Sequence, residues 1–118
     1  MTALVIISTS PPYYYSAAQD AIEAALAASN VGIEVTFVFA QHGLYQLLDM
    51  QDSTYFNKKS MAKQIKVLPL YDIEAIYYVD DDMAPLMLSS DTIVDTAKPI
   101  SSNAFSQLCE SANAVIRF

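Results

Sequence analysis

Cysteine, glycine and histidine are scarce in this chain of 118 residues. Its one cysteine, Cys109, excludes an intrachain disulfide and is typical of a reducing compartment. Its two glycines, Gly32 and Gly43, cannot build a glycine-rich phosphate loop, so the nucleotide-binding motifs are excluded and we expect no cofactor. Because His42 is the only histidine, the sequence offers no cysteine and histidine ligands at metal-binding spacing, and we expect no metal site.

Basic residues are also few. The chain has 6 lysines and arginines against 13 aspartates and glutamates, which gives a formal net charge of −7. Binding to DNA or RNA needs a basic face that neutralises phosphates, so we expect no direct contact with nucleic acid. No apolar run approaches the roughly 20 residues that a membrane-spanning helix requires. The first apolar run lacks a preceding basic segment and is typical of a strand, not of a signal peptide, so we expect a cytoplasmic protein.

Hydrophobic residues are abundant: they make up 53% of the chain, and only 16% of the residues are charged. A chain of this length is expected to form one domain, residues 1–118, and to bury roughly two thirds of the surface that its unfolded form exposes. The apolar fraction is high for this size. It indicates a surface for a partner in addition to the core.

Five short apolar runs rich in β-branched residues are typical of strands in a parallel sheet. They span residues 3–7, 33–40, 73–79, 92–94 and 114–118. Small and apolar residues at helical spacing follow the first run, after a capping-box pattern of Ser16 and Gln19. Further helices are expected at residues 56–68, from the acidic triplet 80–82 through residue 88, and from residue 102 onward.

This alternation predicts an α/β fold with three layers, α/β/α, around a mostly parallel five-stranded sheet. In open sheets of this kind, ligands bind outside the carboxyl ends of the strands. The side chains that follow these ends are therefore candidates for a pocket or an interface. They are Tyr13, Tyr14 and Tyr15 after the first strand, His42 and Tyr45 after the second, and Asp80 and Asp81 after the third.

Each candidate also has a simpler, structural explanation. The three tyrosines suit an interface or pocket, where aromatic residues are enriched, but also a loop that covers the core. His42 suits proton transfer, but also an exposed turn beside a glycine. The acidic triplet can hold a hard cation weakly, or cap a helix in solvent. Cys109 lies within a predicted helix beside Glu110, where packing is a simpler role than that of a reactive thiol.

Three segments together resemble the DsrE/F/H family, in particular its DsrF/TusC branch. They are Gly-x-x-Gln-Leu-Leu at residues 43–48, Leu-Tyr-Asp-Ile-Glu at residues 70–74 and Val-Ile-Arg-Phe at residues 115–118. The first strand, followed by Ser-Thr-Ser-Pro, also fits, and the similarity covers essentially the whole chain. The resemblance implies the same three-layer fold and a subunit of a sulfur-relay assembly.

The resemblance also implies partners. In TusBCD-type complexes, three small homologous subunits form a heterohexamer, and sulfur passes through a cysteine of the TusD-like subunit to a TusE-like carrier. It ends in 2-thiouridine at the wobble position of tRNA, whereas DsrEFH-type complexes use the same architecture in sulfur oxidation. TusD-like and TusB-like subunits are thus the implied partners, and the TusE-like carrier is an indirect one.

The chain departs from this family at the position that carries sulfur. Sulfur-carrying relatives keep a cysteine just after the third strand, where this chain has Val-Asp-Asp-Asp at residues 79–82. Persulfide chemistry needs a thiolate, which these side chains cannot supply. Many relatives also carry an acidic residue at the position of His42. We therefore expect a non-catalytic subunit of a sulfur-relay complex. The alternatives are a sulfurtransferase that uses Cys109 and a stand-alone domain that binds a small ligand at the strand ends.

Overall fold

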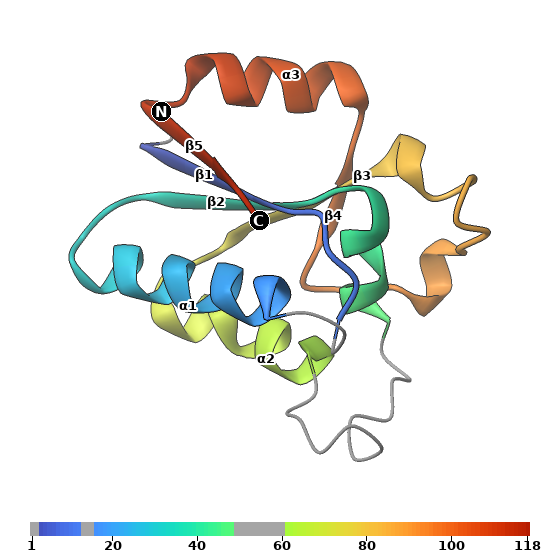
Figure 1. The fold of residues 1–118 in the computed structure, drawn as a ribbon, viewed down its shortest axis with the longest axis horizontal. Helices are drawn as coiled ribbons and strands as arrows, with labels where there is room; N and C mark the ends of the chain where they lie inside the picture. The colour runs from blue at the N-terminus through green and yellow to red at the C-terminus, as the bar shows by residue number, and fades with distance from the viewer. Residues whose placement is uncertain (1–2, 13–15, 49–60) are drawn as a thin grey trace.

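The computed structural model describes residues 3–12, 16–48 and 61–118. Within this part of the chain, five strands form one parallel sheet in the order β4-β3-β2-β1-β5 (Figure 1). The predicted α/β class and the predicted parallel five-stranded sheet are confirmed. The strands are β1 (Leu4–Ser8), β2 (Val35–Phe39), β3 (Ala75–Val79), β4 (Lys98–Ile100) and β5 (Ala114–Arg117).

Helices α1 (Ala17–Asn30) and α2 (Met61–Val67) cover one face of this sheet, and α3 (Ser102–Ser111) lies on the other (Figure 1). The stripe of small residues on α1 is buried against the sheet, as predicted. Its small side chains let the helix lie close to the sheet. Below it, the rings of Phe37 and Phe39 stack with centroids 4.7 Å apart. The buried residues of α1 are Ala18, Ala21, Ile22 and Ala25.

The α3 layer is thinner than the α1 and α2 layer. None of the residues of α3 is fully buried, and its apolar side chains are only half-buried against a small cluster on the sheet. All four residues of β5, the strand at this edge of the sheet, are exposed. The sheet is therefore well covered at its centre and poorly covered along β5.

The prediction of a strand at residues 92–94 is wrong. Thr92 ends a 3-10 helix, η5 (Ser90–Thr92), and Ile93 forms only an isolated antiparallel bridge with Leu48. Ile93 and Val94 are nevertheless buried in the core. Their β-branched side chains are thus explained by burial in an irregular segment, which needs no strand.

The expected helix from residue 80 through residue 88 is also absent. A short 3-10 helix, η4 (Asp80–Asp82), is followed by turns, in which Met87 has a left-handed φ of 58°. The connection between β3 and β4 therefore contains 3-10 turns where an α-helix was expected. Figure 1 shows this segment projecting beyond the carboxyl ends of the strands.

The predicted capping box at α1 does not form. Ser16 occupies the N-cap, but its side chain makes no capping hydrogen bond. The amide of Gln19 instead exchanges two hydrogen bonds with the amide of Gln64 on α2, at 2.9 and 3.0 Å. Gln19 thereby joins two helices. The helix expected at residues 56–68 is described from Met61 to Val67, and a 3-10 helix, η3 (Leu68–Tyr71), follows it.

Candidate functional site

The carboxyl ends of β1 and β2 meet at a very close backbone approach. β2 leads into a 3-10 helix, η1 (Gln41–Leu47), whose Gly43 lies directly against the backbone of Ser8. A Cβ atom at residue 43 would overlap the carbonyl oxygen of Ser8 and lie 2.8 Å from its carbonyl carbon. Only glycine fits there without a backbone shift, and this contact fixes η1 against the loop that follows β1.

Gln46 holds the loop after β1 from inside the protein. It is fully buried, and its Nε2 donates to Oγ of Ser8 at 2.7 Å and to the carbonyl oxygen of Ser10 at 2.9 Å. Its Oε1 is buried and has no hydrogen-bond partner among the described residues. Sequence reasoning assigned no role to this residue. The available signal was a polar side chain in the otherwise apolar run of Leu44, Leu47 and Leu48.

Of the aromatic candidates, the structure places two beside each other. His42 is exposed and Tyr45 is half-buried on η1, with ring centroids 6.0 Å apart and planes tilted by 32°. The other three candidates, residues 13–15, lie outside the described residues. Their role in a pocket or an interface therefore stays a prediction.

The acidic triplet after β3 forms hydrogen bonds to two neighbouring segments. Asp82 accepts from the backbone N–H of Gln41 at 2.7 Å, which holds Gln41 in its left-handed conformation at φ 54°. Asp81 accepts from the N–H of Ser102 at 3.2 Å and from its hydroxyl at 2.6 Å. These two bonds favour the charged carboxylate and lower the pKa of Asp81 below its ordinary value.

The triplet was expected to cap the helix that follows it in sequence. Instead, Asp81 binds the first residue of α3, which lies 21 positions later in the chain. The N-cap of α3 itself is Ser101, whose hydroxyl accepts from the N–H of Ala104 at 3.0 Å. A carboxylate at this end also interacts favourably with the helix dipole.

Cys109 lies away from this site. It is half-buried on α3 and packs against the thin cluster on the sheet. Since α3 begins at the carboxyl ends and Cys109 is two turns further along, the thiol is on the order of 10 Å from the start of the helix. Burial raises the pKa of Cys109 above its ordinary value, so less thiolate is present at neutral pH.

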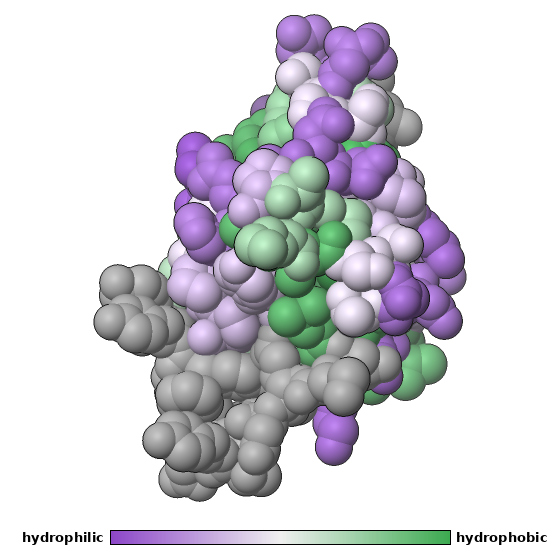
Figure 2. Space-filling model, turned by 90° about the vertical axis from the view of Figure 1, so that its right-hand side faces the viewer, coloured by the Kyte–Doolittle hydropathy of each residue, from purple (hydrophilic) through white to green (hydrophobic). Residues whose placement is uncertain are grey.

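The carboxyl ends of the strands thus bring together an amide, hydroxyls and carboxylates. Figure 2 views this face and shows apolar side chains gathered between polar ones. Among the residues that the structure describes, no three histidine, cysteine or acidic side chains are grouped as a metal site. No helix in the same residues is long and apolar enough to cross a membrane. The groups at the carboxyl ends of the strands can therefore form hydrogen bonds and supply negative charge.

The sequence profile of the DsrE/DsrF-like family matches residues 2–118. The chain belongs to this family. Within it, the TusC branch is indicated by similar proteins: the "Protein TusC homolog" of Vibrio parahaemolyticus serotype O3:K6 is 28% identical over 118 residues and is covered completely, as is this chain. The "Protein TusC homolog" of Vibrio vulnificus (strain CMCP6) is 31% identical over 104 residues, which are 83% of this chain and 88% of the relative.

A solved structure has the same fold. The ychN protein of E. coli superposes with a TM-score of 0.86 over 100% of both chains, at 14% sequence identity. The fold and the family expected from the three sequence segments are therefore confirmed, and so is the DsrF/TusC branch.

Proposed function

We propose that this chain is a non-catalytic subunit of a sulfur-relay complex of the TusBCD or DsrEFH type, in which it supports sulfur transfer for 2-thiolation of the tRNA wobble uridine. Its partners are TusD-like and TusB-like subunits in a cytoplasmic heterohexamer, and a TusE-like carrier meets the complex through them. Membership of the DsrE/DsrF-like family and similarity to TusC homologues along the whole chain support this assignment.

The observation that carries the proposal is the chemistry after β3. Sulfur-carrying relatives keep a cysteine there, whereas this chain has the carboxylates of η4. Asp81 and Asp82 are both hydrogen-bonded to neighbouring segments. Carboxylates cannot form a persulfide, so in the proposed complex the sulfur is carried by a cysteine of another subunit. At this position the carboxylates instead hold neighbouring segments of the chain in place.

Exposed apolar side chains support a role in assembly. Among the described residues, Val31, Leu70 and Met87 are 73%, 81% and 91% exposed, and Val115 and Ile116 on β5 are also exposed. Large apolar side chains exposed to this degree are typical of surfaces that contact other proteins when they lie close together.

Co-expression with TusD-like and TusB-like proteins tests the proposal. With an affinity tag on the TusD-like subunit alone, we expect this chain to co-elute in equal amounts and to migrate in a complex of all three proteins. A matched preparation without the TusB-like subunit shows whether this chain binds the TusD-like subunit directly or only when the TusB-like subunit is present. If this chain purifies as a stable monomer in the presence of both, the proposal is wrong.

The alternative, a sulfurtransferase that uses Cys109, is tested by persulfide loading and intact-mass analysis. The raised pKa and half-burial of Cys109 argue against it. We expect no added sulfur on this chain under conditions that load a TusD-like subunit in the same tube. Sulfur that is gained by the wild type and lost in Cys109→Ser would establish the alternative.

A further inference from the structure

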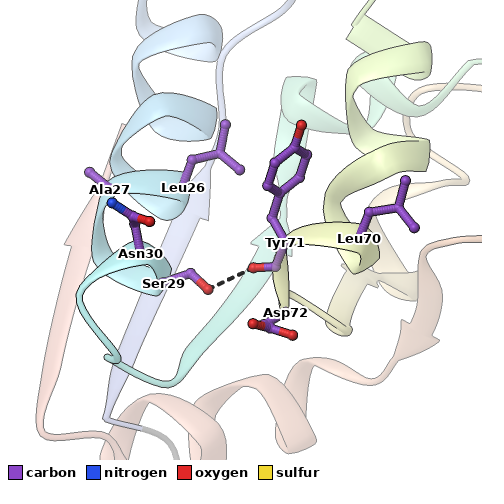
Figure 3. A pocket seen from close by; sticks show the side chains of 7 residues that line it. All are labelled: Leu26, Ala27, Ser29, Asn30, Leu70, Tyr71 and Asp72. Atoms are coloured by element: carbon purple, nitrogen blue, oxygen red, sulfur yellow. Dashed lines mark hydrogen bonds between the residues drawn. The ribbon is translucent and has the colours of Figure 1, made fainter.

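A pocket lies at the end of the molecule opposite to the candidate site. It is formed by the last two turns of α1 and by η3, at the amino ends of the strands, and has a volume of about 610 Å³ (Figure 3). Pockets that hold small-molecule ligands occupy about 300–1,000 Å³. The volume is therefore sufficient for a side chain or a small molecule.

Two hydrogen bonds to backbone carbonyl oxygens hold the walls of this pocket in place. The hydroxyl of Ser29 on α1 donates to the carbonyl oxygen of Tyr71 on η3 at 2.7 Å. The N–H of Asp72 donates to the carbonyl oxygen of Pro69 at 3.2 Å, and Asp72 has a left-handed φ of 68°. As the C-cap of η3, Asp72 lines the pocket together with Ser29 and Asn30 of α1 (Figure 3).

The electrostatics of the pocket favour a cation. The carboxyl end of a helix carries a partial negative charge, and α1 has no basic residue in its last turn to offset it. Asp72 adds a full negative charge, and the described residues that line the pocket include no lysine or arginine. Lys66 lies in the last turn of α2, where it is placed to offset the dipole of that helix.

Aromatic and aliphatic side chains complete the lining. Figure 3 shows the ring of Tyr71 standing between α1 and the end of α2, with Leu26 directed toward it. Tyr71 is 57% exposed, so a face of its ring is available to a cation. Of the eight large apolar side chains that are exposed in the described residues, Leu70 and Tyr71 line the pocket. Val31 directly follows α1 in the sequence, and Val67 directly precedes η3.

We propose that this pocket binds an organic cation on an apolar stem, namely a guanidinium or primary ammonium group. The cationic group lies between the carboxylate of Asp72 and the carboxyl end of α1, and the stem packs on Tyr71 and Leu26. Arginine or lysine of a partner protein and a free alkylamine metabolite share this chemistry. The inference does not depend on the proposed sulfur-relay function.

Two matched fragments test the chemistry directly. Butylguanidinium chloride and its uncharged counterpart butylurea are titrated into the ¹⁵N-labelled full chain, and amide chemical shifts are followed by NMR. We expect saturable shifts at Ser29, Tyr71 and Asp72 with butylguanidinium only, weakened by added salt. Equal effects of the two fragments, no saturable effect, or shifts spread over all acidic surfaces would overturn the proposal.

Substitutions identify the groups responsible. Asp72→Asn keeps a residue that tolerates the left-handed conformation but removes the charge, and we expect about two- to fivefold weaker binding. Tyr71→Leu should weaken binding about two- to fivefold, whereas Tyr71→Phe should retain it. Asp20→Asn, at the opposite end of α1, is the control with the same chemical change and should leave binding unchanged. Binding that is unaffected by Asp72→Asn would contradict the assignment.

A third arm separates the two sources of the cation. The acetylated and amidated peptide Leu-Arg-Leu places the guanidinium in a protein-like context. Tighter binding of this peptide than of butylguanidinium indicates an arginine of a partner, and equal or weaker binding indicates a free amine.

Discussion

Gly43 is the residue at which the smallest change should have the largest structural effect. In Gly43→Ala the new methyl group overlaps the backbone of Ser8, which cannot rotate away as a side chain can. We expect a loss of at least about 2 kcal/mol in the free energy of unfolding, in the upper part of the roughly 1–3 kcal/mol typical of overpacking. Urea denaturation followed by circular dichroism measures it.

Gly32 supplies the control for this substitution. It has a left-handed φ of 86° and open space around it, and asparagine tolerates that conformation. Gly32→Asn should therefore cost less than about 1 kcal/mol. If Gly43→Ala is no more destabilising than Gly32→Asn, the approach of η1 to Ser8 is looser than the structure has it.

Gln46→Glu tests the buried amide. The substitution removes the N–H donors to Ser8 and Ser10 and places a carboxyl group in a fully buried position. Burial raises the pKa of this carboxyl above its unfolded value, so the variant is least destabilised at low pH and loses stability as the pH rises through the interval between the two values. We expect a deficit of at least about 2 kcal/mol at pH 7 that shrinks by pH 5.

Urea unfolding of the wild type and Gln46→Glu at both pH values measures this difference. Gln107→Glu introduces the same change at an exposed position of α3 and should show no comparable pH dependence. A deficit that is equal at pH 7 and pH 5 would mean that the carboxyl group reaches solvent.

At the scale of elements, the link between η4 and α3 has a pH signature. The hydroxyl of Ser102 is the main cause of the lowered pKa of Asp81. In Ser102→Ala only the backbone N–H remains, so we expect the pKa of Asp81 to rise toward 3.8, its ordinary value. A lowered pKa adds stability above the unfolded value that is lost as the pH falls through the folded one. The stability difference between wild type and variant should thus fade as the pH falls below 3.8.

Titration of the Asp81 carboxyl carbon by NMR checks the pKa. Ser106→Ala makes the same chemical change on the exposed side of α3 and should leave Asp81 unaltered. An unchanged pKa in Ser102→Ala would show that the backbone bond or the helix dipole is sufficient alone.

Elements differ in how far the sequence predicts them. The runs at β1, β2, β3 and β5 are apolar and β-branched because these strands lie in a parallel sheet, and they were identified to within two residues at each end. β4 carries no such signal. It contains Lys98 and Pro99, which an edge strand tolerates because one side needs no partner. The hydrogen bonds of Asp81 and Gln46 join segments that are distant in sequence, so no local sequence pattern predicts them.

At the scale of the molecule, the strand order separates a stable centre from weaker edges. β2 is buried along its whole length between β1 and β3, whereas every residue of β5 is exposed. Amide hydrogens exchange most slowly where opening requires the core to unfold, and fastest where few contacts hold the backbone. We expect protection in the isolated protein to decrease from β2 and β1 toward β5 and β4.

The amides within β5 should also alternate. The N–H of Ala114 donates to the carbonyl oxygen of Ala3, and that of Phe118 donates to Ile7, so the even-numbered residues face β1. Val115 and Arg117 alternate with them and direct their N–H groups to the side where no described strand pairs. Hydrogen exchange measured residue by residue by NMR should therefore find Val115 and Arg117 among the fastest amides of the sheet.

Strong protection of both in the isolated chain would mean that another strand pairs with this edge, because burial of side chains alone does not bond an outward N–H. Protection that is gained only in a complex with TusD-like and TusB-like subunits would place their contact on β5.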